Sequence, residues 1–184
     1  GIQLAGSDAR AIAGACDLLH AEAEVGRASF DFVDINLGCP IDALCARGGG
    51  AGLCWRPELE RVVRSSAAVL SVPLSVKLRL GVVEDELLAP ALLRRMRSWG
   101  AGTVAWATIH GRTRNQRYTR LADWNLVRGA CAMAAGAPLR GTAYVPLWDA
   151  SASGHSVQAW HDARTTRPEQ DLPPIPLVGN GDIM

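Results

Sequence analysis

The chain has 184 residues, of which 48% are hydrophobic and 20% are charged, and its formal net charge is +1. This length and composition predict one domain with a buried core, and they exclude an intrinsically disordered chain. No apolar run approaches the roughly 20 residues of a membrane-spanning helix, so we expect no membrane partner.

Short apolar runs alternate along the chain with amphipathic stretches. The predicted strands are Ile2–Leu4, Phe30–Asn36, Leu74–Leu78, Val104–Ile109 and Ile175–Val178. Helices are predicted near residues 8–25, 57–70 and 86–98, where apolar residues recur at three- and four-residue spacing. Alternation of strands and helices at a period of about 30 residues predicts parallel strands joined by crossover helices.

Polar residues follow several predicted strands, at residues 36–39, 77–79, 110–112 and 180–182. Function gathered over successive strand ends is typical of a TIM (β/α)8 barrel, whereas a doubly wound sheet concentrates it at one switch point. No G-x-G-x-x-G follows a strand. We therefore predict an α/β fold, an incomplete TIM barrel with about five of the eight strands. Residues 134–174 break the period and are predicted to be an irregular insertion within this single domain, residues 1–184.

The cysteines indicate a reducing environment. There are five of them, an odd number without a C-x-x-C pair, which argues against a disulfide framework or a zinc site. We expect no metal in this segment and an intracellular location, cytoplasmic or nuclear.

Charge is unevenly distributed along the chain. Residues 1–60 carry four arginines and nine acidic residues, whereas residues 91–130 carry eight arginines and one acidic residue. A basic segment of this kind is either a surface that faces phosphates or a solvated helix face, and both interpretations stay open. Lys77 is the only lysine among 19 basic residues. A compact ammonium differs from a planar guanidinium, so we expect a specific role for Lys77.

The segment with the strongest chemical signal runs from Asn36 through Cys39 and Pro40 to the glycines at residues 48–50. A strand delivers Asn36 and Cys39 to its carboxyl end, and the glycines permit a tight backbone close to a ligand. A lone cysteine is ordinarily a small buried hydrophobe, and glycines alone form a flexible loop. The combination favours a functional turn.

This arrangement resembles the N-x-G-C-P signature of the tRNA dihydrouridine synthase family, in particular its eukaryotic branch, which acts on uridine 47 of the tRNA variable loop. Further segments resemble the same family in the same order, and these are residues 1–6, 76–81, 110–124 and 176–183. The resemblance covers residues 1–133 and 175–183. It implies FMN as cofactor, NADPH or NADH as reductant and tRNA as partner.

The resemblance also implies roles for individual residues. Reduced FMN passes hydride to C6 of uracil, and Cys39 protonates C5, which suits a thiol because an ordinary thiol is mostly protonated at neutral pH. The expected cofactor contacts are Gln3 and Lys77 at the isoalloxazine edge and His110, Asn180 and Gly181 near the ribityl chain or phosphate. The expected substrate contacts are Asn36 and Arg79 near the uracil and Arg112 and Arg114, with Arg117 and Arg120, on tRNA phosphates.

Two alternatives stay open. Another FMN barrel, such as a dihydroorotate dehydrogenase, also places an asparagine and a cysteine–proline turn at a strand end. The second alternative is that the chain is a truncated, inactive relic, because segments that the family places before residue 1 and after residue 184 are absent. Whichever interpretation holds, we expect residues 1–184 alone to form an open sheet that aggregates through its edges and not a stable, active enzyme.

Overall fold

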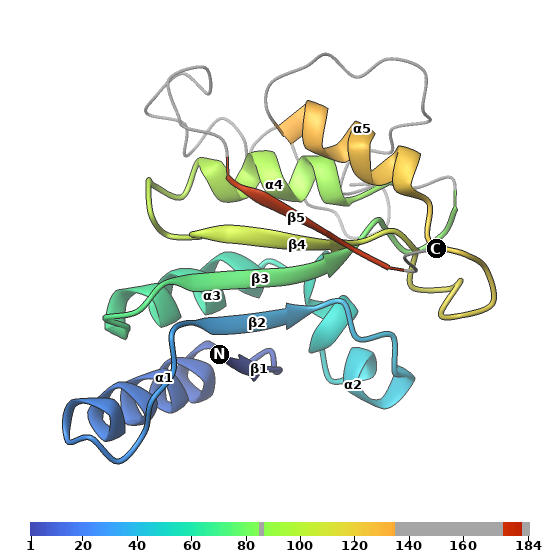
Figure 1. Cartoon of the computed structure of the whole chain (residues 1–184). Helices are drawn as coiled ribbons and strands as arrows, with labels where there is room; N and C mark the ends of the chain where they lie inside the picture. Colours follow the sequence, from blue (N-terminus) through green and yellow to red (C-terminus); the bar gives the residue numbers. More distant parts are fainter. Residues whose placement is uncertain (85–86, 135–174, 182–184) are drawn as a thin grey trace.

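The computed structural model describes residues 1–84, 87–134 and 175–181 of the chain (Figure 1). The strands are β1 (Ile2–Leu4), β2 (Val33–Leu37), β3 (Leu74–Arg79), β4 (Trp106–His110) and β5 (Leu177–Asn180). The helices are α1 (Ala9–Glu24), α2 (Asp42–Ala46), α3 (Glu58–Val69), α4 (Ala89–Arg97) and α5 (Trp124–Ala134), with a 3-10 turn η1 (Gly50–Leu53).

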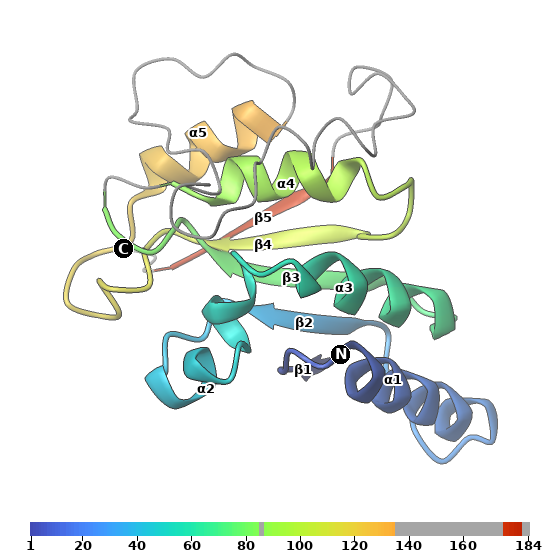
Figure 2. The ribbon, with the colours of Figure 1, turned by 180° about the vertical axis from the view of Figure 1, so that it is seen from behind.

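All strand pairs are parallel, and the strands follow one another in the order β1-β2-β3-β4-β5. A doubly wound sheet would reverse its strand order at a switch point, whereas sequential order is that of a barrel wall. Helices α3 and α4 lie behind the sheet in Figure 1 and in front of it in Figure 2, so they cover one face. The prediction of a parallel α/β fold that forms part of a barrel is therefore confirmed. Within the described residues, β1 and β5 each pair on one side only.

The helices form where the sequence supplies start signals and an apolar face. Asp8 caps α1, since its Oδ1 accepts hydrogen bonds from the backbone N–H groups of Arg10 and Ala11. Pro57 precedes α3 and Pro90 lies in the first turn of α4, where a missing N–H costs nothing. The predicted helices are confirmed with slightly shorter bounds.

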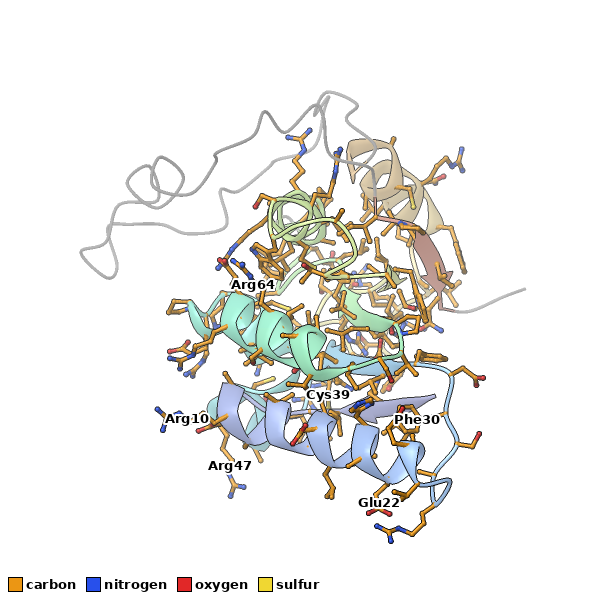
Figure 3. The ribbon with its side chains drawn as sticks, turned by 90° about the vertical axis from the view of Figure 1, so that its left-hand side faces the viewer. Arg10, Glu22, Phe30, Cys39, Arg47 and Arg64 are labelled. Atoms are coloured by element: carbon orange, nitrogen blue, oxygen red, sulfur yellow. The ribbon has the colours of Figure 1, made fainter. Side chains whose placement is uncertain are left out.

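The core lies between these helices and the sheet. Its largest fully buried side chains include Ile35, Leu37, Leu78 and Ile109 from the strands, packed against helical residues such as Leu92. Burying each such side chain stabilises the fold by about 1.5–3 kcal/mol. Figure 3 shows the charged side chains of Arg10 and Arg47 projecting from the surface.

Four predicted strands have shifted bounds, and the one predicted at Leu74–Leu78 differs least, since it runs on to Arg79. The strand predicted at Phe30–Asn36 begins at Val33 and runs on to Leu37, because the ladder with β3 pairs Val33 with Leu74. The strands predicted at Val104–Ile109 and Ile175–Val178 both begin and end later along the chain. Pairing between neighbouring strands decides these bounds, and an apolar run alone does not show it.

The sequence analysis did not predict α2, η1 or α5. The first two are short turns of helix, below the length at which periodicity is visible. The start of α5 does carry a signal, since Asp123 accepts hydrogen bonds from the N–H groups of Asn125 and Leu126 as an N-cap. The insertion predicted at residues 134–174 lies outside the described residues, apart from the last residue of α5.

Candidate active site at the carboxyl ends of the strands

The two faces of the sheet differ in polarity. Side chains alternate between faces along a strand, and residues in register on parallel neighbours share a face. One face is apolar and packs on the helices. The other carries three rows, Gln3–Asp34–Ser75–Trp106, then Asn36–Lys77–Thr108–Val178, then Arg79–His110–Asn180. Every strand residue that the sequence analysis selected, from Gln3 to Asn180, therefore lies on this second face, which we call the polar face.

Cys39 lies in a turn that Asn36 organises. The Oδ1 atom of Asn36 accepts hydrogen bonds from the backbone N–H groups of Gly38 (3.0 Å) and Cys39 (2.8 Å). The side chain of Cys39 is half-buried, whereas Cys45 and Cys54 beside it are buried. The turn therefore presents one accessible thiol at the end of β2.

Two buried thiols support the same turn from below. The Sγ atom of Cys45 donates to the carbonyl of Cys39, and that of Cys54 donates to the carbonyl of Leu37. Burial raises the pKa of the Cys54 thiol to about 12. These two cysteines hold the backbone, so Cys39 is the accessible one of the three thiols at this turn.

The glycine segment predicted after Cys39 packs directly against its backbone. Gly50 has a φ of +55°, and a Cβ atom built there would lie 2.8 Å from the carbonyl oxygen of Cys39. The N–H of Ala51 donates to that same oxygen at 3.0 Å. Only glycine meets both the left-handed conformation and the close approach at this position.

A hydrogen-bonded chain runs across the first three strands beneath the turn. Ser75 Oγ and Gln3 Nε2 donate to the two carboxylate oxygens of Asp34, at 2.6 and 2.7 Å. Gln3 Oε1 accepts in turn from Asn36 Nδ2 at 2.8 Å. Asp34 and Ser75 were not predicted as site residues, although alternation on β2 and β3 places them on the face of Asn36 and Lys77.

Lys77 supplies the cation at the centre of the polar face. Its side chain is half-buried, and it has no hydrogen bond or ion pair within residues 1–84, 87–134 and 175–181. Burial and the charge of Arg79 lower its pKa, and Asp34 and Cys39 oppose that shift. A partly desolvated ammonium without a partner is suited to an anionic or electron-rich ligand.

Arg79 joins the Cys39 turn to the loop after β4. Its Nε donates to the carbonyl of Gly38, and its Nη1 donates to the carbonyls of Thr113 and Arg117. The guanidinium is buried, which lowers its pKa, and it lies 5.7 Å from the ring centre of Tyr118. These contacts occupy three N–H donors of the Arg79 guanidinium, the group that we expected from the sequence to face a substrate.

The predicted group at the ends of β4 and β5 is brought together. His110 is in register with Asn180, and a Cβ atom at Gly181 would lie 3.8 Å from Cδ2 of His110. Arg112 is buried, with its Nη1 3.0 Å from Nε2 of His110. His110, Asn180 and Gly181 thus line one side of the polar face, with Arg112 behind His110.

Arg114 and Arg117 contact an acidic residue of the Cys39 loop. Asp42 accepts from Nη2 of Arg114 through one carboxylate oxygen and from Nη2 of Arg117 through the other, both at 2.8 Å. Asp42 is 73% exposed, so these pairs are largely solvated. The exposed ring of Tyr118, in the same loop, lies 5.7 Å from the guanidinium carbons of both Arg79 and Arg112. The loop is basic, as predicted, and Asp42 partly neutralises it.

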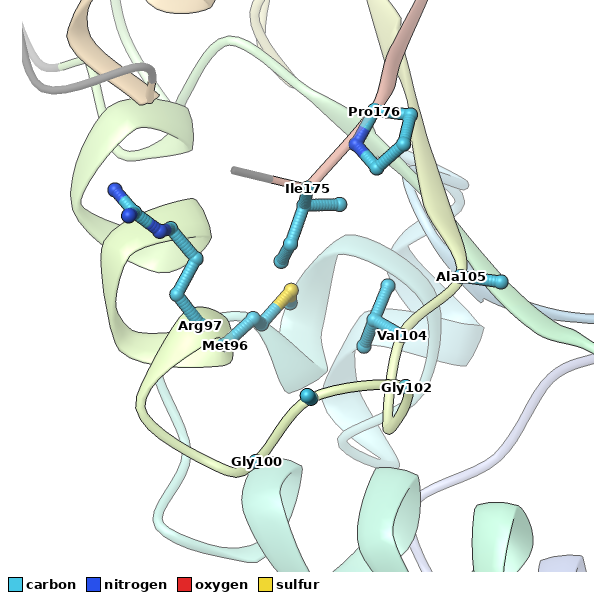
Figure 4. A pocket seen from close by; sticks show the side chains of 9 residues that line it. Met96, Arg97, Gly100, Gly102, Val104, Ala105, Ile175 and Pro176 are labelled. Atoms are coloured by element: carbon cyan, nitrogen blue, oxygen red, sulfur yellow. The ribbon is translucent and has the colours of Figure 1, made fainter. Parts of the chain in front are cut away.

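A pocket lies at the opposite end of the sheet and is separate from this site. It is formed by the end of α4, the loop to β4 and the residues before β5 (Figure 4), with Met96, Val104 and Ile175 among its lining. In the part of the chain described, no three histidine, cysteine, aspartate or glutamate side chains gather as metal ligands. No described helix is long and apolar enough to cross a membrane.

Sequential parallel strands with polar residues collected at their carboxyl ends define the class of barrel proteins that build sites on strand ends. The family model described as "Dihydrouridine synthase (Dus)" matches residues 1–135, and the chain belongs to this family. The match decides between the two FMN-barrel families considered above, in favour of the synthases.

Relatives support the same assignment. A tRNA-dihydrouridine(47) synthase NAD(P)(+)-like protein of Rattus norvegicus is 44% identical over 142 residues, 77% of this chain and 21% of the relative. The tRNA-dihydrouridine(47) synthase NAD(P)(+) of Malassezia globosa is 36% identical over 87% of the chain and 18% of the relative. That of Coprinopsis cinerea is 32% identical over 99% of the chain and 22% of the relative. The chain thus spans about one fifth of the length of the curated relatives it matches.

Proposed function

We propose that the protein carrying this chain reduces uridine to 5,6-dihydrouridine in tRNA, with FMN as cofactor and Cys39 as proton donor. The observation that carries the proposal is the Cys39 turn, fixed by Asn36 at the end of β2, next to the polar face with Lys77, which has no partner among the described residues. Family membership supports the reaction type. The proposed target is uridine 47, the position that the names of the relatives specify.

The polar face fits a flavin. Lys77 offers an ammonium that no described residue engages, and it lies in register beside Asn36. Gln3 would contact the same edge of the ring, while His110, Asn180 and Gly181 would line the ribityl or phosphate side. Bound FMN, once reduced by NADPH or NADH, would supply the hydride for C6 of uracil.

Cys39 would donate its proton to C5 of the same ring. The thiol is half-buried at the strand end, so a base on the polar face could reach it, and the buried Cys45 and Cys54 could not replace it. Asn36 would orient the uracil through the second hydrogen of its amide nitrogen, since its first is donated to Gln3. Arg79 would contribute through the cationic field of its guanidinium and through the loop that it holds in place.

Arginines of the loop after β4 would meet tRNA phosphates. Arg114 and Arg117 are paired with Asp42, yet the triad keeps a net positive charge and faces solvent. Arg112 is buried and would act by supporting the loop, because its Nε donates to the carbonyl of Arg120. Phosphate contacts of this kind set affinity and orientation, and they do not read sequence.

The test uses the full-length protein and tRNA that lacks dihydrouridine, with NADPH and NADH supplied separately. We expect a bound-flavin absorbance band and dihydrouridine at position 47 of the product, located by mass spectrometry of nuclease fragments. Dihydroorotate serves as the control substrate and should not be oxidised. A flavin-free protein even after FMN is added, or a flavoprotein that leaves every tRNA uridine intact, would contradict the proposal and favour an inactive relic.

A further inference from the structure

Asp34 is a buried carboxylate to which the proposed reaction gives no role. It is the second residue of β2, only 6% exposed, and it has neutral hydrogen-bond partners on both neighbouring strands. Burying an ionisable group is costly unless its hydrogen bonds are satisfied, so this position calls for an explanation.

The hydrogen bonds of Asp34 continue, without interruption, to the backbone of Cys39. Asp34 accepts from Gln3, Gln3 accepts from Asn36, and Asn36 accepts from the N–H groups of Gly38 and Cys39. All of these distances lie between 2.7 and 3.0 Å. We call this sequence of contacts the amide relay.

The amide relay has one direction, which is fixed at both ends: the carboxylate of Asp34 can only accept, and the backbone N–H groups of Gly38 and Cys39 can only donate. The two ends of a side-chain amide have nearly the same shape, so Gln3 and Asn36 could each sit either way round. An ionised carboxylate only accepts hydrogen bonds, and it therefore requires the NH2 group of Gln3 to face it. That choice turns Gln3 Oε1 toward Asn36, and the Asn36 oxygen is left to receive the N–H of Cys39.

We propose that Asp34 is a positioning residue, which fixes the orientation of the Gln3 and Asn36 amides and through them the backbone of Cys39. The proposal rests on the proposed function in one respect, that Cys39 is the proton donor. The charge of Asp34 also acts on Lys77, since it opposes the effects of burial and of Arg79 that lower the Lys77 pKa. Asp34 would in this way support both the thiol and the cation of the site without touching substrate.

A merely structural Asp34 would behave differently. In that case its contacts with Ser75 and Gln3 would only hold β1, β2 and β3 together, and any satisfied polar side chain would serve. The amide relay instead depends on which group donates and which accepts at each contact between side chains. A pair of substitutions that reverses these roles together should therefore preserve it.

The experiment exchanges the carboxylate and the amide between positions 34 and 36 of the full-length protein, in two steps. Asn36→Asp places a second carboxylate opposite Gln3, whose single NH2 group cannot serve both carboxylates. Adding Asp34→Asn supplies an NH2 group that donates to Gln3 Oε1, while its oxygen still accepts from Ser75. Gln3 then donates to the carboxylate at position 36, which still accepts from the N–H groups of Gly38 and Cys39. The control is Asp34→Leu with Asn36→Asp, which also removes the charge of Asp34 but donates nothing.

The main readout is the alkylation rate of Cys39 by iodoacetamide, measured by peptide mass spectrometry, with Cys131 on α5 as an internal reference. Asn36→Asp should accelerate alkylation of Cys39 about tenfold or more, because an unsatisfied buried polar contact loosens the turn. Adding Asp34→Asn should return the rate to within about threefold of the unaltered protein, whereas adding Asp34→Leu should not. The melting temperature should follow the same order.

The outcomes separate the two proposals. Equal rescue by Asp34→Asn and Asp34→Leu would show simple charge repulsion and overturn the relay, as would no rescue by either. Failure of the transposed double variant to fold would also overturn it. Dihydrouridine formation by the unaltered protein is measured in parallel, and its absence would refute the proposed function while the Cys39 alkylation rates still judged the relay.

Discussion

Replacing Gly50 with alanine tests how closely the glycine segment holds the Cys39 turn. The φ of +55° costs a residue with a Cβ atom about 1–2 kcal/mol. The new methyl group would also lie 2.8 Å from the carbonyl oxygen of Cys39 and 3.0 Å from its Cβ. That oxygen cannot simply move away, because it accepts from Ala51 and Cys45. Overpacking of this kind adds about 1–3 kcal/mol, so Gly50→Ala should destabilise the fold by about 2–5 kcal/mol.

Gly14→Ala is the matched control. Gly14 lies on the exposed side of α1 with no atom within 4 Å of a built Cβ, so the same chemical change should stabilise by about 0.5–1 kcal/mol. Both variants are measured by chemical denaturation and by turnover of dihydrouridine formation. Only Gly50→Ala should also slow turnover, because it displaces Cys39. A Gly50→Ala protein as stable and active as the unaltered one would refute the packing described for this turn.

Three further predictions follow from single side chains. Lys77→Arg should slow flavin reduction about tenfold or more, because a planar guanidinium crowds the position of a compact ammonium; stopped-flow reduction at an unchanged rate would contradict this. Cys54 has a pKa raised to about 12, so its contribution to stability is complete below the ordinary thiol value near 9.0 and is lost as the pH rises from there through 12. As the pH rises through the accessible part of this range, the denaturation midpoint of Cys54→Ala should fall less than that of the unaltered protein. An equal fall in both proteins would count against a buried neutral thiol at Cys54. Asp42→Asn should release Arg114 and Arg117, tightening tRNA binding at low salt and steepening its salt dependence by about one ion per arginine released; weaker binding would show that Asp42 orders the loop instead.

The sequence was sufficient to place the site at the strand ends. Strand–helix alternation predicted the parallel sheet, and polar residues after successive strands predicted where they would gather. The roles given to Asn36, Lys77 and His110 came from the family resemblance, and the strand register places all three on one face. The face on which a strand residue lies can be predicted from sequence, because side chains alternate between the two faces from one residue to the next.

The supporting contacts could not be predicted, because they depend on register and loop geometry. In the sequence Asp34 is an ordinary polar residue, and only the fold brings the side chain of Gln3, 31 positions away, into hydrogen-bond contact with it. Arg79 was expected to face a substrate, and only the folded loop shows its guanidinium on three backbone carbonyls. The pairing of Asp42 with Arg114 joins residues 72 positions apart, beyond the reach of any local pattern.

The most direct test of the central claim compares Cys39→Ala with Cys131→Ala in the full-length protein. Both thiols are half-buried, but only Cys39 lies in the turn at the end of β2. The assay measures bound FMN by absorbance, flavin reduction by stopped flow and dihydrouridine at tRNA position 47 by mass spectrometry. Cys39→Ala should keep FMN and its reduction and lose at least about a hundredfold in dihydrouridine formation, the usual weight of one positioned acid, while Cys131→Ala matches the unaltered protein. Undiminished dihydrouridine formation by Cys39→Ala would contradict the assignment of Cys39 as the proton donor.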